Sequence, residues 1–231
     1  MIKIIAISDS HDKHNEIYVP SGDILIHAGD VTMTGTKQQL TDFVIWMAKQ
    51  PCTHKIWVAG NHDWGMETDQ AAYAMWAGRR GRNKLMDVNQ VRSEIIALCN
   101  SLGVTYLHNS GINIEGLNIW GSPDTPAFYG WAFNRTQKEL QEHWKTVPDN
   151  TDILVTHGPA YGVLDNLEDG TMVGDVALMK RINTLPNLKL HVCGHIHSGY
   201  GVLEVDGSTR VNASLLNDSY QVQNKAVEIT L

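Results

Sequence analysis

The sequence predicts an α/β fold in which a mainly parallel sheet presents polar side chains at the carboxyl ends of its strands. Five short apolar runs, typical of buried strands, each end in a glycine, serine or threonine that precedes a carboxylate, amide or imidazole. These runs are residues 2–7, 23–28, 55–59, 153–155 and 188–193. A helical pattern lies between the second and third runs, and such a strand–helix–strand unit joins parallel strands by a right-handed crossover.

The first strand, residues 2–7, leads into a polar and irregular segment, and the second strand begins near residue 24. A helix is predicted over residues 36–50, because its apolar residues fall on one face at helical spacing and Pro51 follows. That apolar face consists of Leu40, Phe43, Val44 and Met47. The third strand, residues 55–59, then ends at Gly60, which permits a tight exit toward the ligand-binding edge of the sheet.

Residues 64–87 are interpreted either as a short helix or as a lid over the site. They include a cationic run, residues 79–84, for which solvated surface is the favoured interpretation and phosphate binding the alternative. A second amphipathic helix is predicted from Val91 to Leu102. Three short strands follow and are expected to form a meander, because turn signals separate them. They are residues 104–107, 112–114 and 117–120.

Residues 122–134 are rich in aromatic residues, proline and glycine, and show neither a helical nor a strand period. Their aromatic side chains are expected either to cover an edge of the core or to form a stacking wall for a nucleobase or aryl group. These side chains are Phe128, Tyr129, Trp131 and Phe133. Helices are predicted at 136–145 and 175–183, with a loop over residues 159–174 that could cover the site, and short antiparallel strands follow from residue 201 to the last at 227–230.

Composition limits the possible functions. The chain has 231 residues and no linker that would divide it, so a single domain spanning residues 1–231 is expected. A formal net charge of −7 argues against stable binding of duplex nucleic acid or of an anionic membrane surface. Three cysteines without a C-x-x-C spacing, no secretory leader and no membrane-spanning apolar run together predict a cytoplasmic protein. Composition leaves the oligomeric state open.

The strand ends supply seven oxygen and nitrogen donors, which exceed the needs of one metal ion but suit two ions that share a carboxylate. The seven are Asp9, His11, Asp30, Asn61, His157, His195 and His197. Asp30 is the expected bridge, because a carboxylate offers two oxygens. The absence of cysteine from the set disfavours a structural zinc cage and favours two divalent ions, Mn²⁺ with Fe²⁺ or Zn²⁺ as alternatives.

Two divalent ions against two carboxylates leave a charge of about +2, which attracts an anionic phosphoester to the site. His62 adjoins Asn61 but is not needed as a ligand, so it is the expected catalytic residue that protonates the leaving group or stabilises its charge. Asp63 is expected to cap a helix, with orientation of His62 as the alternative. The other candidates are interpreted as ordinary surface residues: Asp12, His14, His27, His54, His108, His143 and His191.

The polar segments at the strand ends, taken in chain order, resemble the sequence motifs of the calcineurin-like metallophosphoesterases. The motifs of that family are D-x-H, G-D, G-N-H-[DE], a lone histidine after a strand, and G-H-x-H. The motifs stand here as Asp9-Ser10-His11, Gly29-Asp30, Gly60-Asn61-His62-Asp63, Thr156-His157-Gly158 and Gly194-His195-Ile196-His197. The resemblance implies a four-layer α/β/β/α metallophosphoesterase sandwich with a dinuclear metal site at the strand ends. It also implies that Asp9, His11, Asp30 and His197 hold one ion, that Asp30, Asn61, His157 and His195 hold the other, and that His62 is catalytic.

A closer likeness covers nearly the whole chain, which resembles the 239FB-type group of metallophosphoesterase-domain-containing proteins. The segments that carry this resemblance are residues 122–134, 156–159 and 197–201. This likeness implies a phosphodiesterase that hydrolyses cyclic nucleotides or related small phosphodiesters with a hydroxide bound by two metal ions. Some animal members carry glycine at the position of His195, so the histidine here implies a competent enzyme. A phosphomonoesterase of the same fold and a catalytically weak nucleotide- or metal-binding module are the alternatives.

Two other enzymes of this fold are disfavoured. Ser/Thr protein phosphatases continue Gly-Asp with a Val-Asp-Arg-Gly element, whereas Gly29-Asp30 is followed here by Val31-Thr32-Met33-Thr34. A repair nuclease needs additional DNA-binding segments, for which this chain has neither the length nor the cationic balance. The expected partner is therefore a small phosphodiester or nucleotide substrate.

Overall fold

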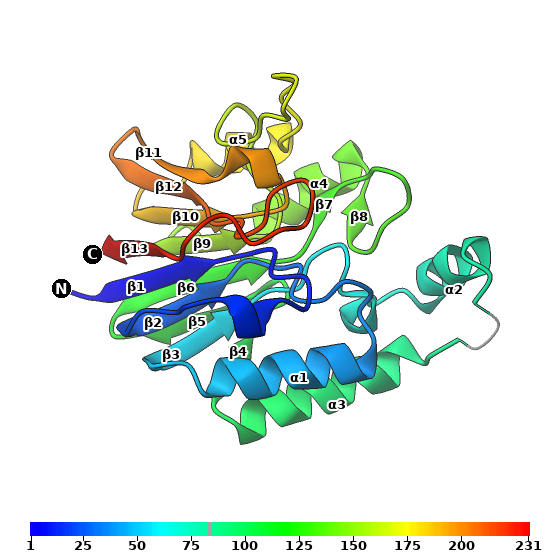
Figure 1. Cartoon of the computed structure of the whole chain (residues 1–231). Helices are drawn as coiled ribbons and strands as arrows, with labels where there is room; N and C mark the ends of the chain where they lie inside the picture. Colours follow the sequence, from blue (N-terminus) through cyan, green and yellow to red (C-terminus); the bar gives the residue numbers. More distant parts are fainter. Residues whose placement is uncertain (83–84) are drawn as a thin grey trace.

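A computed structural model of the chain describes residues 1–82 and 85–231. Two β-sheets pack face to face, and helices cover the outer face of each sheet, which gives four layers (Figure 1). The α/β class and the four-layer α/β/β/α sandwich expected from the sequence are thereby confirmed.

The first sheet has the strand order β13-β1-β2-β3-β4 among the described residues. Its strands are β1 (Lys3–Ile7), β2 (Gly22–His27), β3 (Cys52–Trp57), β4 (Val104–Tyr106) and β13 (Val227–Thr230). β1 to β4 are parallel, as expected for a chain that alternates strand and helix, whereas β13 runs antiparallel to β1.

The second sheet has the strand order β11-β12-β10-β9-β6-β5 among the described residues. Its strands are β5 (Ser110–Ile114), β6 (Leu117–Ser122), β9 (Ile153–Thr156), β10 (Leu190–Cys193), β11 (Gly201–Val205) and β12 (Ser208–Asn212). The central strands are parallel, and an antiparallel hairpin forms each edge. A short parallel pair, β7 (Thr125–Pro126) with β8 (Asn134–Arg135), frames the aromatic segment.

Helices α1 (Lys37–Ala48) and α3 (Val88–Ser101) cover the first sheet, and α4 (Gln137–His143) and α5 (Val176–Ile182) cover the second (Figure 1). Helix α2 (Gln70–Arg79) lies at one end of the molecule, apart from both sheets (Figure 1). Short 3-10 turns complete the chain: η1 (His14–Glu16), η2 (Trp64–Met66), η3 (Trp144–Thr146) and η4 (His197–Gly199). None of the helices in the part of the chain that the structure describes has the length and apolar character of a membrane span.

Burial on both faces explains why the strands of the first sheet have continuous apolar sequences. In β1, Ile5 and Ile7 pack in the cluster under α1 and α3, whereas Ile4 and Ala6 face the second sheet. A third apolar cluster, which includes Trp144, packs α4 and α5 against the outer face of the second sheet. Three separate apolar layers therefore hold the four layers of secondary structure together.

The meander predicted for the strands near residues 104–120 is wrong. β4 pairs with β3 in the first sheet, whereas β5 and β6 form a hairpin in the second. The chain crosses between the sheets after β4, where Asn109 has a left-handed backbone with a φ of 51°. An apolar pattern indicates a buried strand but does not indicate which of two packed sheets it joins.

The segment at residues 64–87 contains a helix, α2, which agrees with one of its two interpretations. Asn83 and Lys84 of the cationic run lie outside the described residues. The loops that leave β1, β2, β9 and β10 contact one another: Asp9 N donates to Gly29 O, and Gly194 N donates to His157 O. Between the sheets, His195 N donates to Asp9 Oδ2 at 2.9 Å, so the carboxyl ends of strands from both sheets meet at one edge of the molecule.

Candidate metal centre

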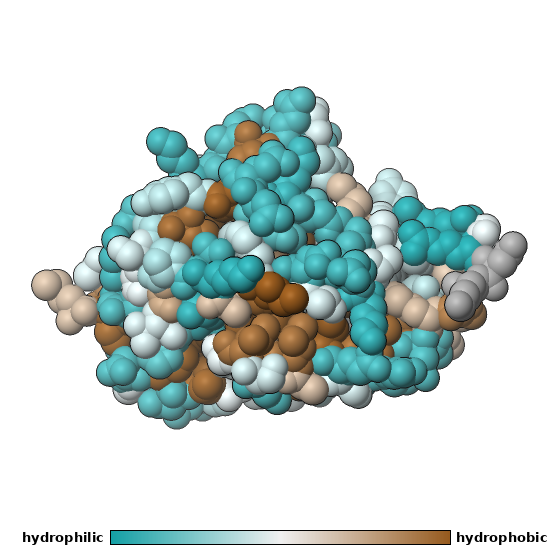
Figure 2. Space-filling model, turned by 60° about the horizontal axis from the view of Figure 1, so that its bottom comes forward, coloured by the Kyte–Doolittle hydropathy of each residue, from teal (hydrophilic) through white to brown (hydrophobic). Residues whose placement is uncertain are grey.

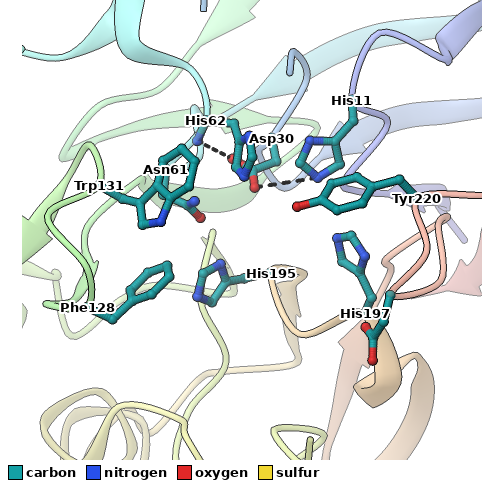
Figure 3. A pocket seen from close by; sticks show the side chains of 10 residues that line it. His11, Asp30, Asn61, His62, Phe128, Trp131, His195, His197 and Tyr220 are labelled. Atoms are coloured by element: carbon teal, nitrogen blue, oxygen red, sulfur yellow. Dashed lines mark hydrogen bonds and ion pairs between the residues drawn. The ribbon is translucent and has the colours of Figure 1, made fainter. Parts of the chain in front are cut away.

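The seven predicted donors converge at this edge. Asp9 and His11 follow β1, Asp30 follows β2, Asn61 follows β3, His157 follows β9, and His195 and His197 follow β10. Most of them line a cavity of about 210 Å³, together with His62 (Figure 3). Asp9 and His157 are fully buried below the lining residues. The structure thus brings together every donor that the sequence predicted, and we call these seven residues the candidate metal centre.

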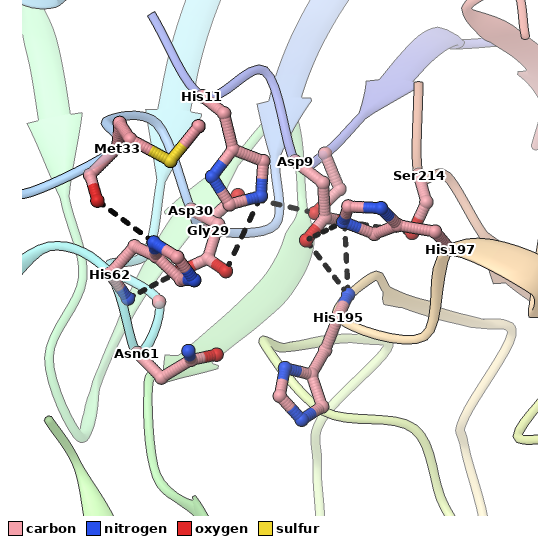
Figure 4. A network of polar contacts seen from close by, with 12 residues as sticks. Asp9, His11, Gly29, Asp30, Met33, Asn61, His62, His195, His197 and Ser214 are labelled. Carbon is pink, nitrogen blue, oxygen red and sulfur yellow. Dashed lines mark hydrogen bonds and ion pairs between the residues drawn. The ribbon is translucent and has the colours of Figure 1, made fainter. Parts of the chain in front are cut away.

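Asp9, His11 and His197 form one group, in which the nearest donor atoms all lie within 4.8 Å of one another. The carboxylate of Asp9 accepts hydrogen bonds from His195 N at 3.0 and 2.9 Å and from Ser214 Oγ at 2.8 Å (Figure 4). Nε2 of His197 lies 3.7 Å from Asp9 Oδ1, too far for a direct hydrogen bond. The donors His195 and Ser214 both follow strands of the second sheet, so that sheet holds in place a carboxylate that follows β1 of the first sheet.

Asp30, His157 and His195 form a second group by the same criterion. Asp30 Oδ2 lies 3.6 Å from His11 Nε2 and 3.4 Å from His157 Nε2, so this carboxylate stands between the two groups. Asp30 Oδ1 accepts a 2.7 Å hydrogen bond from the backbone N–H of His62. Asp30 therefore occupies the position expected of a bridge.

The backbone around these donors is unusual. Asp9, His11, Asp30 and His195 have φ angles of 54°, 40°, 52° and 70°, which place non-glycine residues in the left-handed region. A Cβ at Gly60 would collide with Asp30 Oδ1, so only glycine permits this approach of the third strand's exit to the carboxylate. Strained backbone of this kind is typical of functional sites, where it is retained because it aims side chains.

The buried carboxylates control the charge of their neighbours. Burial raises the pKa of Asp9, but contact with His197 and its positive charge outweigh burial, so the pKa of Asp9 lies below its usual range. Burial lowers the pKa of His157 and His197, but Asp30 and Asp9 respectively reverse the effect and raise both to about 9. Burial lowers the pKa of His11 to about 4. The two carboxylates therefore attract positive charge, which protons on His157 and His197 supply when no metal ion is bound.

The donor set fits divalent metal ions. Both ring nitrogens of the buried His11 lack a hydrogen-bond partner among the described residues, which is costly unless a cation is bound. Nδ1 of His157 donates to Ala28 O at 2.9 Å, while its Nε2 faces Asn61 Oδ1 at 2.9 Å. Nδ1 of His197 likewise donates to Asn217 O at 3.0 Å. A backbone carbonyl that holds one ring nitrogen and turns the other toward the site is the usual support of a metal-binding histidine.

His62 lies on the wall of the cavity. Its Nδ1 donates to Met33 O at 2.9 Å, so Nε2 is the nitrogen left for the cavity (Figure 4). Its ring stacks on Trp131, with centroids 4.4 Å apart, and meets His11 edge-on at 4.7 Å. His62 also forms a group of possible donors with His11 and Asp30, so geometry alone permits either a ligand or a proton donor.

The side chains of the aromatic segment are divided between the core and the cavity. Phe133 is fully buried in the core, whereas Phe128 and Trp131 line the cavity on one side (Figure 3). Tyr129 is 92% exposed and belongs to neither group. Tyr220 lines the opposite side of the cavity, next to Asp218. Asp218 and Tyr220 belong to no strand-end motif, so no sequence pattern indicated that they would line the cavity.

The prediction that Asp63 caps a helix is wrong. Its side chain makes no capping bond to η2 within the described part of the chain. Instead its carboxylate accepts hydrogen bonds from Val31 N at 3.1 Å, Thr32 N at 2.9 Å and Gly60 N at 2.8 Å. Asp63 therefore ties the loop after β2 to the loop after β3, a contact between distant segments that local sequence does not reveal.

Three histidines expected at the surface are buried. His14, His27 and His191 have exposed fractions of 4%, 0% and 1%. His27 Nε2 pairs with Ser10 Oγ at 3.0 Å, and His191 Nε2 pairs with Thr156 Oγ1 at 2.8 Å. Burial lowers the pKa of His27 and His191 to about 3, so both are neutral residues of the core.

Comparison with known proteins identifies a family whose members are similar to this chain. The model of the calcineurin-like phosphoesterase family matches residues 2–199. "Metallophosphoesterase domain-containing protein 1" of Homo sapiens is 36% identical over 99% of this chain and 71% of its own length. A "UPF0046 protein" of Caenorhabditis elegans is 34% identical over 98% of this chain and 74% of its own length. Among solved structures, phosphopantetheinyl hydrolase from Mycobacterium tuberculosis has the same fold, with a TM-score of 0.53 at 17% identity over 92% of this chain and 88% of that one.

Proposed function

The chain belongs to the calcineurin-like phosphoesterase family, and from this premise we propose that it is a metal-dependent phosphodiesterase. The proposed substrates are cyclic nucleotides or related small phosphodiesters. The observation that carries the proposal is the convergence of seven oxygen and nitrogen donors from both sheets on one small cavity. An anionic ester is the natural ligand of a cavity built around two cations.

We assign the metal ligands as follows. Asp9, His11, Asp30 and His197 hold one ion, and Asp30, Asn61, His157 and His195 hold the other. Mn²⁺ is the proposed ion, with Fe²⁺ or Zn²⁺ as alternatives, because the donors are carboxylate, amide and imidazole. When bound, such ions supply Lewis-acid activation of water and neutralise phosphate charge.

His62 is the proposed catalytic residue. Its Nδ1–H is fixed on Met33 O, which directs Nε2 to the cavity, and the Trp131 ring restricts its rotation. A protonated Nε2 can donate to the oxygen that leaves phosphorus, a role that requires a positioned imidazole within hydrogen-bond reach. The backbone N–H of His62 meanwhile holds Asp30 in place.

The residues around the cavity favour a diester over a monoester. Neither lysine nor arginine is among the lining residues in the described part of the chain. A monoester dianion carries more charge than a diester and therefore gains more from lysine or arginine side chains beside the metal ions. Phe128 and Trp131 supply an apolar wall for the second ester group, which a phosphomonoesterase does not need.

A substrate panel tests the function. Purified protein with added Mn²⁺, Fe²⁺ or Zn²⁺ is assayed on 2′,3′- and 3′,5′-cyclic mononucleotides, linear dinucleotides, bis-aryl phosphate and the matching monoesters. We expect the highest kcat/KM on a diester. Faster hydrolysis of monoesters would establish the phosphomonoesterase instead, and metal-loaded protein that cleaves none of these esters would leave only a binding module.

We further propose that the protein acts in the cytoplasm on small molecules and does not bind duplex nucleic acid or membranes. Cys52, Cys99 and Cys193 are all buried and form no disulfide within the described structure, as expected in a reducing compartment. The net charge of −7 opposes association with polyanions outside the metal centre.

A further inference from the structure

Helix α2 carries a cationic group at the end that faces the cavity wall. Arg79, Arg80 and Arg82 follow one another at its carboxyl end in a chain whose net charge is −7. Residues 68–82, the arm that bears α2, stand apart from the sheets (Figure 1), and Figure 2 shows both hydrophilic and apolar residues on the visible surface of the arm. Within the described residues, none of these three arginines forms an ion pair with a carboxylate. No carboxylate of the described residues therefore lies close enough to neutralise their positive charge.

Arg80 lies over two neighbouring indoles, Trp76 and Trp131, whose ring centroids are 6.5 Å apart. Its guanidinium carbon lies 5.1 Å from the ring centroid of Trp76 and 4.9 Å from that of Trp131. Trp76 is buried against Trp64, with their rings stacked at 4.7 Å, so this support is itself fixed. The planar guanidinium carries its N–H donors in a fork that matches phosphate. Arg80 is thus pre-organised for an anion.

Trp131 connects Arg80 to the metal centre. Trp131 lines the cavity, and its ring stacks on that of His62 with the centroids 4.4 Å apart. The guanidinium of Arg80 lies over the same Trp131 ring. Arg82 by contrast contacts Trp76 alone of these rings, at 4.6 Å, and Arg79 contacts Met75. Arg80 is therefore distinguished from its neighbours by its contact with Trp131, a residue that lines the cavity.

We propose that Arg80 binds a second phosphate of the substrate, one that is not part of the ester being hydrolysed. The inference rests on the proposed phosphodiesterase function and narrows its substrates to nucleotides that carry an additional phosphate. The diester group occupies the metal centre, where the described lining residues include no arginine, and the additional phosphate lies over the Trp131 side of the cavity. A solvated surface arginine needs neither indole, whereas an anion-binding arginine gains affinity when its geometry is fixed beforehand.

Calorimetry of Mn²⁺-loaded protein with two nucleotides tests this site. Adenosine 3′,5′-bisphosphate is expected to bind about tenfold more tightly than adenosine 5′-monophosphate, as one charge-assisted bidentate contact provides. Arg80→Gln is expected to remove that advantage and leave the two affinities about equal. Arg82→Gln is the matched control, since it removes a stacked arginine from the same arm, and it is expected to keep the advantage. Circular dichroism verifies that both variants are folded.

Equal binding of the two nucleotides to the unmodified protein, or an unchanged ratio in Arg80→Gln, would overturn the proposal. Turnover of bis-aryl phosphate by the unmodified protein is measured in parallel and tests the proposed function separately, because that ester has no additional phosphate. Loss of the bisphosphate advantage in both variants would contradict the specific role of Arg80 and indicate a diffuse effect of arm charge.

Discussion

At the scale of single residues, strain and hydrogen bonding coincide in the metal centre. A non-glycine residue in the left-handed region costs about 1–3 kcal/mol, and Asp9, His11, Asp30 and His195 all adopt it. The backbone N–H groups of His62 and His195 donate to the carboxylates of Asp30 and Asp9, which fixes the strained loops to one another. The strain is therefore confined to the residues whose donor atoms converge, as expected where geometry matters more than stability.

His62→Ala is expected to retain both metal ions and to lose hydrolysis of bis-aryl phosphate by about a hundredfold or more, because a proton donor contributes at least that factor. Metal content by mass spectrometry and kcat measure the two effects. His54→Ala is the control, since His54 lies outside the cavity and only approaches Glu115, at 3.9 Å. Loss of one ion in His62→Ala would make His62 a ligand, which its group with His11 and Asp30 also permits.

Asp12 supports His62 through Met33, a role that its sequence context did not indicate. Asp12 Oδ2 accepts hydrogen bonds from Met33 N at 3.1 Å and from Gln39 Nε2 at 2.6 Å, and Met33 O holds His62. Asp12→Ala is expected to lower kcat by about tenfold with KM and metal content unchanged, because misplacement of a positioned group slows the reaction without weakening binding. Asp12→Asn, which retains an acceptor, is expected to restore much of kcat; a variant that lost kcat and metal together would indicate a general loss of structure.

The sequence predicted that the seven side chains of the candidate metal centre converge, because each of them lies within a few residues of the end of a strand. The strand ends are local features, and their convergence follows from the parallel sheet. Asp12, Asp63 and Tyr220 were not predicted in their observed positions, because their partners come from other segments. Asp63, for example, contacts the loop after β2 across 31 and 32 positions of sequence.

At the scale of elements, Glu67 joins two segments whose roles the sequence left open. Its side chain is almost fully buried, and Oε2 accepts a 2.6 Å hydrogen bond from Phe133 N in the aromatic segment. Oε1 accepts a 2.6 Å hydrogen bond from Thr68 N, directly before α2. Asn134 Oδ1 then accepts hydrogen bonds from Phe128 N at 3.1 Å and Trp131 N at 3.0 Å. The cavity wall is therefore anchored to the arm that carries α2.

Glu67→Gln is expected to destabilise the protein by about 1–3 kcal/mol, because one oxygen that accepts a backbone N–H becomes an amide donor in a buried position. Urea denaturation measures the change in free energy of unfolding. Glu168→Gln, at an exposed position, is the control and should leave stability nearly unchanged. Glu67→Gln should also raise KM for aryl diesters, since the positions of Phe128 and Trp131 depend on this anchor. Equal stability of Glu67→Gln and Glu168→Gln would mean that Glu67 does not anchor the wall.

The elements themselves were predictable where a pattern was long enough. α1 has Leu40, Phe43, Val44 and Met47 on its buried face, as predicted, and Thr36 caps it. The pairing of β4 with β3 was missed, because a strand of three residues, Val104–Tyr106, is too short to specify its partner. The joint role of Glu67 and the aromatic segment was also beyond local sequence, since Glu67 and Phe133 lie 66 positions apart.

At the scale of the whole molecule, both ends of the chain are joined in one sheet. β13 pairs with β1, and Val227 and Ile229 enter the apolar layer between the sheets. The hairpin of β11 and β12 completes the second sheet beside β10. We therefore propose that residues 1–231 form one domain, because strands after the family match at residue 199 are integral to both sheets.

The stability of the ion-free protein and its affinity for metal ions should both depend on pH. In the ion-free protein the pKa of His157 and of His197 is raised from 6.5 to about 9: burial opposes the charged form, but Asp30 and Asp9 outweigh it. A pKa raised by folding contributes stability that is fully present below pH 6.5 and is lost as pH rises through about 9. Bound ions replace these protons, so the affinity for Mn²⁺ should rise with pH across the same window.

The increase in Tm caused by saturating Mn²⁺ is accordingly expected to grow as pH is raised from 6.5 toward about 9. Calorimetric titration in buffers of different ionisation enthalpy should register proton release on metal binding near neutral pH. His157→Asn removes one of the two protonated ligands, so it should release fewer protons while the remaining donors still bind an ion. A Tm increment that is constant with pH, or metal binding without proton release, would show that these imidazoles do not face the ions, because a ligand histidine must give up its proton before it coordinates.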